Sequence, residues 1–390
     1  MRTWADIRFE ALAANLAALR QLLPARAGLL LPVKANAYGH GAVPIARWAE
    51  ELGVSWLGVA TVDEGVELRA AGVAARVLLF GPLPLARVGE VAHSRITPTL
   101  CSVEEAARWA RVAPGVPAHV EVDTGMGRAG FDWRSRCVDR LARLSGISIE
   151  GVYSHFPAAD SDIEFTAEQR RRFGEVLERL AREGVRPALT HLANSAAVLG
   201  GCPDTCELAR PGIAAYGSCA SFREALREQD RGRGRGTTSL RPVLQWWARI
   251  VQLRDFAAGD SVGYGRTVRL DRPTRAALLA VGYGDGYPRS QAAEGFVEIR
   301  GRRCRILGRI SMDLTLVDAT PAPEVRMGED ALLLGEAPGL SADDLAGRSG
   351  TIGYEILTAI RARVERRYLR GPEARMAAPE PVGEAEAQAR

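Results

Sequence analysis

The chain has 390 residues, of which 47% are hydrophobic and 25% are charged. This size and composition are typical of a soluble globular protein with two domains. The net charge of only +4 argues against nucleic acid as the main partner, and no apolar run approaches the ~18 residues of a membrane span. Charged residues near the N-terminus do not fit a signal peptide, so we expect a cytoplasmic protein without a membrane partner.

The first half of the chain alternates between apolar strand-like segments and helical stretches, beginning with an amphipathic helix at 15–23. Among the helices, 166–183 is the clearest, because Thr166 and Gln169 have the spacing of a capping box and an apolar face follows. Eight strands are expected, at 29–33, 56–60, 77–80, 96–100, 118–122, 149–154, 189–192 and 207–210. Eight such units predict a (β/α)8 TIM barrel, with an open doubly wound sheet as the alternative.

The second half has a different texture. A polar segment near 220–240 contains an alternating arginine-glycine run at 231–236, which we interpret as an exposed interdomain loop rather than an RNA contact. Strands expected at 246–253, 275–281, 295–300 and 314–317 predict a mostly β C-terminal domain. The expected domains are therefore 1–235 and 236–370, with the first residues a candidate for packing against the second domain and 371–390 a disordered tail.

The six cysteines are scattered, and the only close pair is Cys202 and Cys206. No second pair or histidine lies at ligand spacing, so no metal site is expected.

Lys34 is the only lysine of the chain, although lysine and arginine together number 51. An arginine side chain stays protonated, whereas a desolvated lysine amine can lose its proton and attack a carbonyl to form a Schiff base. Lys34 is therefore a candidate nucleophile; the alternative is a lysine that survived by chance in an arginine-rich composition.

Other reactive side chains also follow predicted strands, where a barrel gathers its catalytic groups. Arg128 follows the fifth strand, His155 the sixth, Asn194 and Ser195 the seventh, and Arg210 with Gly212 and Ile213 the eighth. The last two loops of a barrel commonly seat a phosphate. Each residue alone has an ordinary structural explanation, but a lysine amine facing a phosphate seat suggests pyridoxal 5'-phosphate.

The segment Val33–Gly41, with sequence VKANAYGHG, resembles the cofactor-lysine signature of alanine racemases. Similarity to this family continues through 122–128, 151–156, 191–195, 210–217, 263–267, 282–286, 308–313 and 351–355. The blocks in the second domain separate the racemases from related decarboxylases and from small non-enzymatic barrels that bind the cofactor.

The resemblance implies a homodimer that interconverts L- and D-alanine and supplies D-alanine for cell-wall peptidoglycan. Lys34 would hold pyridoxal phosphate and act as the base on the D face, and Tyr264 of the partner subunit would be the base on the L face. Arg210 would face the pyridine nitrogen. Implied cofactor contacts are Tyr38, His155, Asn194, Ser195, Gly212, Ile213 and Tyr354; implied substrate contacts are Arg128 and Met312; implied supporting residues are Asp313, Tyr283, Asp160, Arg289, Arg309 and Ile352.

One position departs from the family pattern. Glu121 stands where several members have a lysine that is carbamylated, and as an anion it could orient Arg128 through a charge-assisted hydrogen bond. The alternatives to an alanine racemase are a serine or broad-specificity racemase, a non-enzymatic cofactor carrier and, from the arginine-glycine run alone, a nucleic-acid-binding protein.

Overall fold

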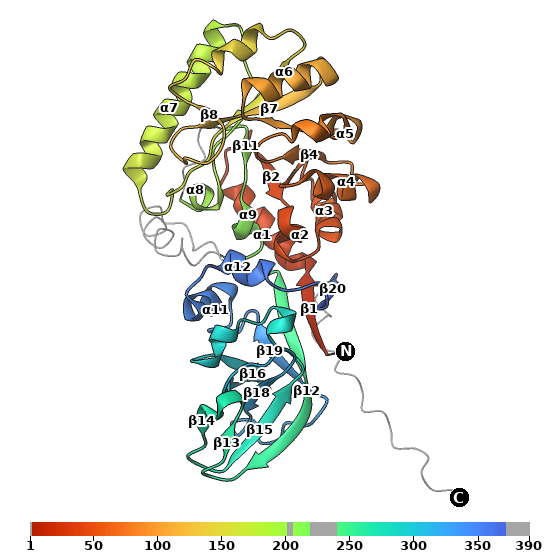
Figure 1. Cartoon of the computed structure of the whole chain (residues 1–390), viewed down its shortest axis with the longest axis vertical. Helices are drawn as coiled ribbons and strands as arrows, with labels where there is room; N and C mark the ends of the chain where they lie inside the picture. The colour runs from red at the N-terminus through yellow and green to blue at the C-terminus, as the bar shows by residue number, and fades with distance from the viewer. Residues whose placement is uncertain (1, 201–205, 219–239, 372–390) are drawn as a thin grey trace, which may run out of the picture.

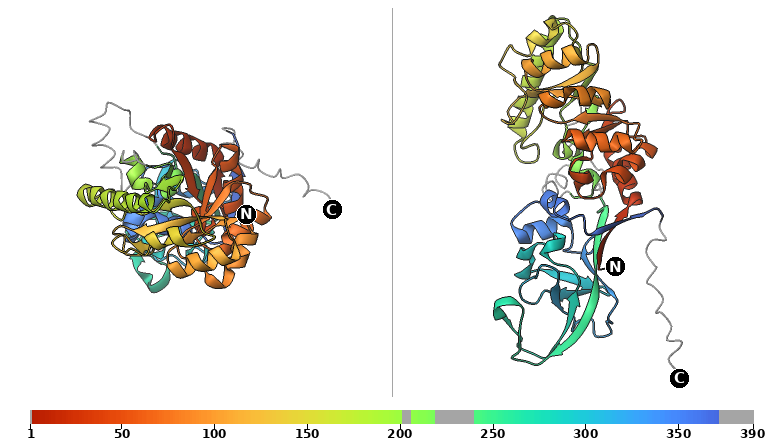
Figure 2. Two further views of the ribbon diagram at one scale, coloured as in Figure 1. Left: turned by 90° about the horizontal axis from the view of Figure 1, so that it is seen from above. Right: turned by 45° about the vertical axis from the view of Figure 1, so that its right-hand side comes forward.

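The computed structural model describes residues 2–200, 206–218 and 240–371. Figures 1 and 2 show a barrel surrounded by helices, followed along the long axis of the molecule by a β-rich domain. The arginine-glycine run, the predicted domain boundary at 235/236, Cys202 and the tail from 372 lie outside the described residues, so the expectations about them stay predictions.

The first domain has a barrel of parallel strands, and the short strand β8 (Phe131–Asp132) pairs with β7 beside it. The strands that form the barrel are β2 (Gly28–Pro32), β3 (Trp56–Val59), β4 (Arg76–Leu79), β5 (Ile96–Thr97) with β6 (Thr99–Leu100), β7 (Pro117–Asp123), β9 (Ser148–Tyr153), β10 (Leu189–His191) and β11 (Leu208–Ala209). Hydrogen bonds join them as β11-β2-β3-β4-β5 and as β10-β9-β7-β6. Pro98 separates β5 from β6, and a parallel bridge between Asn194 and Arg210 joins the two arcs on the other side. The predicted barrel is confirmed, and the open sheet is wrong.

Side chains of alternate strand residues fill two separate layers. Leu30, Trp56, Leu78, Tyr153 and Leu208 pack together as a small buried cluster of their own. Their neighbours in sequence, such as Leu29 and Leu31, instead join the main core.

The barrel helices are α1 (Phe9–Gln21), α2 (Lys34–Tyr38), α3 (Ala42–Glu51), α4 (Val62–Ala70), α5 (Val88–His93), α6 (Val103–Val112), α7 (Ile163–Arg182), α8 (Ser195–Leu199) and α9 (Gly212–Ala215). The first helix begins at Phe9, earlier than the predicted 15–23. In the described part of the chain, no helix combines the length and the apolar character needed to cross a bilayer.

The predicted capping box of α7 is wrong. The helix begins one turn earlier, where the Asp162 carboxylate accepts a hydrogen bond from the Phe165 N–H at 2.8 Å. Thr166 lies inside the first turn and donates to the Asp162 carbonyl, while the Gln169 side chain donates to Thr124 and to the His155 carbonyl. Gln169 therefore joins the helix to the strand ends rather than capping it.

The second domain is mostly β, as predicted. Its strands are β12 (Leu244–Phe256), β13 (Ser261–Val262), β14 (Val268–Arg269), β15 (Thr274–Leu279), β16 (Phe296–Ile299), β17 (Arg302–Arg305), β18 (Thr315–Asp318), β19 (Asp330–Leu334) and β20 (Glu365–Leu369), with helices α11 (Ala342–Ser349) and α12 (Gly353–Thr358). The N-terminal strand β1 (Thr3–Arg8) pairs antiparallel with β12 and parallel with β20, so it belongs to this sheet. The chain therefore begins in the second domain before it builds the barrel.

Candidate active site

Lys34 lies directly after β2, at the carboxyl end of the barrel strands. Its amino group is 5.7 Å from the centre of the Phe80 ring. Burial is the largest cause that lowers the pKa of this amine, and the positive charges of Arg128 and then Arg210 lower it further. A larger fraction of the amine is therefore neutral, which is the form that attacks a carbonyl.

The backbone after Lys34 forms a left-handed turn. Ala35, Asn36, Ala37 and Tyr38 have φ values of 51°, 55°, 52° and 52°, a region that residues other than glycine seldom adopt. Surrounding groups hold the turn: the Glu64 carboxylate accepts the Ala35 N–H at 2.7 Å, and the Asn36 side-chain oxygen accepts the Ala42 N–H at 2.8 Å. Glu64 also forms the capping box of α4 with Thr61, but its contact to Ala35 joins residues that are distant in the sequence, so no local pattern points to it.

Arg210 is buried at the same end of the barrel, and its guanidinium is engaged by several acceptors. One terminal nitrogen donates to the His191 Nδ1 at 2.7 Å, and the other donates to the Ser154 carbonyl at 2.7 Å and to the His155 Nδ1 at 3.3 Å. Burial, and then the charge of Arg210, lowers the pKa of His155 to about 3, and the same two causes hold the pKa of His191 well below its usual value. Both histidines are therefore neutral near pH 7 and accept from Arg210.

A line of polar groups continues from Arg210 through the barrel. Because His191 accepts at Nδ1, its Nε2 is free to donate to the His119 Nδ1 at 2.9 Å. His119 Nε2 lies 3.8 Å from the Glu150 carboxylate, which pairs with Arg76. His119 could not be identified from the sequence, because it is an isolated histidine in the middle of a strand and its partners are distant in the chain.

The loops after β10 and β11 pack closely against each other and against Tyr38; we call Tyr38, Ser195, Gly212 and Ile213 the Gly212 seat. Asn194 caps α8 through the Ala197 N–H, and the Ser195 hydroxyl accepts the Ala214 N–H at 3.2 Å. A Cβ atom at Gly212 would lie 2.7 Å from the Tyr38 hydroxyl, so only glycine leaves room for that oxygen. Ile213 is buried beside Gly212 in α9.

Tyr354 brings the second domain to this seat. It lies on α12, and its ring centre is 5.9 Å from that of Tyr38. Burial raises the pKa of Tyr354 to about 12, and the negative charge of Asp160 adds to the effect. Asp160 therefore lies near the seat, while Ile352, the residue before α12, is 62% exposed.

Glu121 does not contact Arg128, so the expected direct hydrogen bond is wrong. The buried Glu121 carboxylate instead accepts the Tyr153 hydroxyl at 3.1 Å, and the Cys101 sulfur lies 3.7 Å away. Within the described residues the Arg128 side chain has no hydrogen bond or ion pair. The shorter reach of glutamate leaves it inside the barrel, under the strand ends.

The remaining candidates lie on the β domain. Tyr264 is 70% exposed and Met312 is 54% exposed. The Arg309 guanidinium lies beside the loop that carries Tyr264. A Cβ atom added to Gly265 in that loop would lie 3.1 Å from it. Tyr283 belongs to a loop whose backbone N–H groups donate to the Ser311 and Met312 carbonyls. Asp313 forms an ion pair with Arg363 at 2.6 Å. Arg289 begins a 3-10 turn.

Within one chain, Tyr264 and Lys34 do not meet. Tyr264 lies between β13 and β14, which Figure 1 shows at the end of the β domain away from the barrel, whereas α2 lies beside α12 at the junction of the domains. The structure thus brings the cofactor-seat candidates together and leaves Tyr264 apart from them.

The class that the structure defines is a (β/α)8-barrel protein with a lone lysine, of lowered amine pKa, at the end of the barrel that also holds the buried Arg210. Comparison with known proteins narrows this class. The model of the alanine racemase N-terminal domain matches residues 7–220, and that of the C-terminal domain matches residues 243–368. The chain belongs to the alanine racemase family.

Individual relatives agree over nearly the whole chain. Alanine racemase 2 of Caldanaerobacter subterraneus subsp. tengcongensis is 35% identical over 377 residues, covering 94% of this chain and 95% of that protein. The alanine racemase of Symbiobacterium thermophilum is 38% identical over 381 residues, covering 94% and 97%. The crystal structure of alanine racemase from a D-cycloserine-producing Streptomyces lavendulae has a TM-score of 0.85 at 35% identity, covering 96% and 98%.

Proposed function

We propose that this protein is a pyridoxal-phosphate-dependent racemase that interconverts L- and D-alanine. It acts in the cytoplasm as a homodimer and supplies D-alanine for peptidoglycan. The observation that carries the proposal is the placement of the only lysine, with a lowered amine pKa, at the barrel rim that also holds Arg210 and the Gly212 seat. We infer alanine as the substrate because the relatives are named alanine racemases.

The residues at the rim fit the cofactor. Lys34 would hold its aldehyde carbon, and the absence of a Cβ at Gly212, which leaves room for the Tyr38 hydroxyl, would let that hydroxyl and the nearby backbone bind the phosphate. Ser195, Ile213 and Tyr354 would complete the phosphate site. When bound, pyridoxal phosphate supplies an electron sink for the charge left at Cα when its proton is removed.

Arg210 would weaken that electron sink. Its guanidinium does not give up a proton near neutral pH, so a pyridine nitrogen that faced it would stay unprotonated. A weaker sink favours rapid return of the proton to Cα over transamination. His155 and His191, both neutral, keep Arg210 in place without competing for its charge.

Racemisation needs an acid–base group on each side of Cα. For L-alanine, Tyr264 of the partner subunit takes the proton on one face and Lys34 returns a proton on the other; for D-alanine the roles reverse. Arg128, which has no partner among the described residues, is available to bind the substrate carboxylate.

The test is to incubate the cofactor-loaded protein with L-alanine and separately with L-serine, and to follow the enantiomers by chiral chromatography. We expect D-alanine to accumulate to an equal mixture and D-serine to form more slowly. Faster turnover of serine would favour the broad-specificity alternative. No racemisation of either amino acid, despite bound cofactor, would leave only a cofactor carrier.

A further inference from the structure

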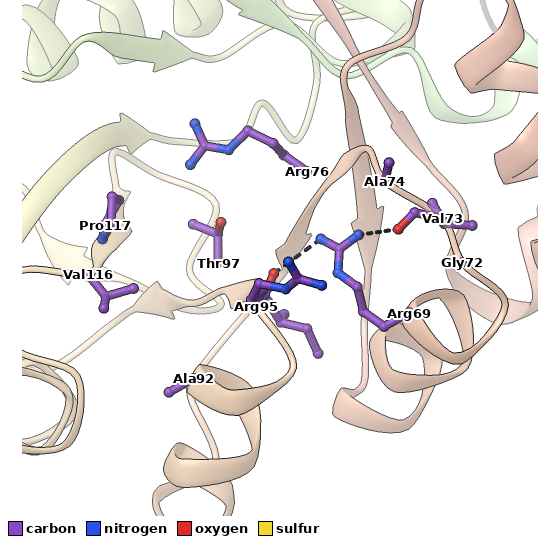
Figure 3. Close-up of a pocket in the computed structure, with 11 residues that line it drawn as sticks. Arg69, Gly72, Val73, Ala74, Arg76, Ala92, Arg95, Thr97, Val116 and Pro117 are labelled. Atoms are coloured by element: carbon purple, nitrogen blue, oxygen red, sulfur yellow. Dashed lines mark hydrogen bonds between the residues drawn. The ribbon is translucent and has the colours of Figure 1, made fainter.

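A pocket lies at the amino end of the barrel, opposite the rim that holds Lys34. Its volume is about 590 Å³, within the range of small-molecule sites. It is formed where β4, β5 and β7 begin, together with the segment between α4 and β4 and the end of α5 (Figure 3). Because the strands are parallel, this pocket and the Gly212 seat lie at opposite ends of the barrel.

The lining of this pocket is strongly cationic. It includes Arg69, Arg76 and Arg95 and contains no carboxylate. Two carboxylates lie just outside: Glu150 pairs with Arg76 at 2.5 Å, and Glu50 accepts the Ala74 N–H at 2.7 Å. Three guanidinium groups therefore face two neighbouring anions, and one positive charge is left uncompensated.

Arg95 carries that charge. Its side chain is exposed and, in the part of the chain that the structure describes, makes no hydrogen bond or ion pair. Its backbone is left-handed, with φ 52°, where glycine or asparagine is usual. Burial lowers the pKa of the neighbouring Arg69, and the positive charge of Arg95 lowers it further. A bound anion would relieve this repulsion.

One further donor in the pocket is available. Figure 3 shows Thr97 between Arg76 and Arg95, and its hydroxyl has no hydrogen-bond partner among the described residues. Arg69 uses its terminal nitrogens on the Val73, Ala75 and Arg95 carbonyls, so it adds positive charge rather than a free donor. Guanidinium forks and a hydroxyl are the groups that recognise phosphate oxygens.

We propose that this pocket binds a small organic phosphate. Its phosphate group lies between Arg76, Arg95 and the Thr97 hydroxyl, and its carbon skeleton lies against Val73, Ala92 and Val116, which also line the pocket. Arg76 stacks on the Trp56 ring at 4.1 Å and is held by Glu150, so this part of the site is preformed.

The experiment is calorimetric titration of the protein, saturated with pyridoxal phosphate, with glycerol phosphate. Saturating the cofactor seat first removes the other phosphate site, and free glycerol serves as the uncharged control probe. Arg95→Gln is the main variant, because an exposed, unpartnered side chain can be changed without loss of folding. Arg108→Gln is the matched control, since Arg108 is exposed on α6 outside the pocket and the charge change is the same.

We expect saturable binding of glycerol phosphate, none of glycerol, and a dissociation constant about tenfold higher in Arg95→Gln than in Arg108→Gln. Absence of saturable binding would overturn the proposal. Equal weakening in both variants would also overturn it, because it would indicate general charge attraction. Binding that releases pyridoxal phosphate and is unchanged in Arg95→Gln would place glycerol phosphate in the cofactor site. This result would also overturn the proposal.

Discussion

Among single residues, Lys34 differs from every arginine of the chain because its amine can lose its proton when it is desolvated. Its position after β2 and that of Arg210 after β11 were predictable, since strand ends are readable from apolar segments. Glu64, His119 and Tyr153 were not predictable, because their importance comes from partners distant in the sequence.

Lys34→Arg tests whether Lys34 holds the cofactor covalently. The positive charge is kept, but a guanidinium cannot form the Schiff base, so we expect no covalent cofactor and a loss of activity of about 10²–10⁴-fold or more. Visible absorption of the purified variant measures the first effect. A retained absorption band would contradict the assignment, because the chain has no other lysine to replace Lys34.

Glu121→Gln tests the role of a buried charge. The negative charge of Glu121 raises the pKa of Lys34, so its removal should lower that pKa and move the acidic limb of the pH–rate profile to lower pH. Cys101→Ala is the matched control, because it removes a contact to Glu121 and leaves the charge. A profile that is the same in both variants would mean that Glu121 is only structural.

At the scale of elements, the strands were predictable and the ends of helices were less so. The start of α7 shows why. Aspartate and threonine are both residue types that can cap a helix, Asp162 and Thr166 lie one turn apart, and the apolar face of the helix fits either start. The left-handed turn after Lys34 was unpredictable for another reason. Its residues contain no glycine, and contacts from Glu64 and Asn36 hold the conformation.

Asp162→Ala tests the observed cap. Loss of the hydrogen bond to the Phe165 N–H should lower the free energy of unfolding by about 1 kcal/mol, measured by urea denaturation. Asp162→Ser, which can still cap, should recover most of the difference. If Asp162→Ala has the same free energy of unfolding as the parent and Thr166→Ala has a lower one, the helix begins at Thr166, as the sequence pattern predicted.

At the scale of the whole molecule, the sequence predicted only that the first residues are a candidate for packing against the second domain, and it did not predict strand β1. Pairing of β1 with β12 and β20 joins segments from both ends of the chain, and no local pattern specifies such partners. The same distance problem applies to the site, because Lys34 and Tyr264 lie on different domains and do not meet within one chain.

A mixture of two inactive variants tests whether two chains share a site. Lys34→Ala lacks one base and Tyr264→Phe lacks the other, so each alone should be inactive. Exchange of subunits between them should restore about a quarter of the parent activity, since half of the dimers are hybrids with one intact site of two. If mixing restores nothing although hybrid dimers form, each chain contributes both bases to its own site.

Buried histidines predict how stability depends on pH. Burial lowers the pKa of His40 to about 4 and, together with Arg210, that of His155 to about 3. Unfolded histidine binds its proton near pH 6.5, so the unfolded state takes up more protons below that pH and the folded state loses stability as pH falls from ~6.5 toward 4. Each such group contributes up to about 1.4 kcal/mol per pH unit.

Urea midpoints measured at pH 7 and pH 5, with equal cofactor loading, check this slope. His40→Gln should reduce it, because one neutral buried ring is removed. Equal midpoints at the two pH values would mean that the folded and unfolded chains bind the same number of protons, which contradicts lowered pKa values for these rings.

The solitary lysine also makes the protein its own spectroscopic probe. Isotope-labelled lysine supplied during expression would enter at one position, so the side-chain resonance of Lys34 would need no assignment. Its chemical shift would report cofactor attachment, substrate binding and protonation at the reacting nitrogen. In a protein of 42.0 kDa such a resonance usually overlaps with those of other lysines, which this chain does not have.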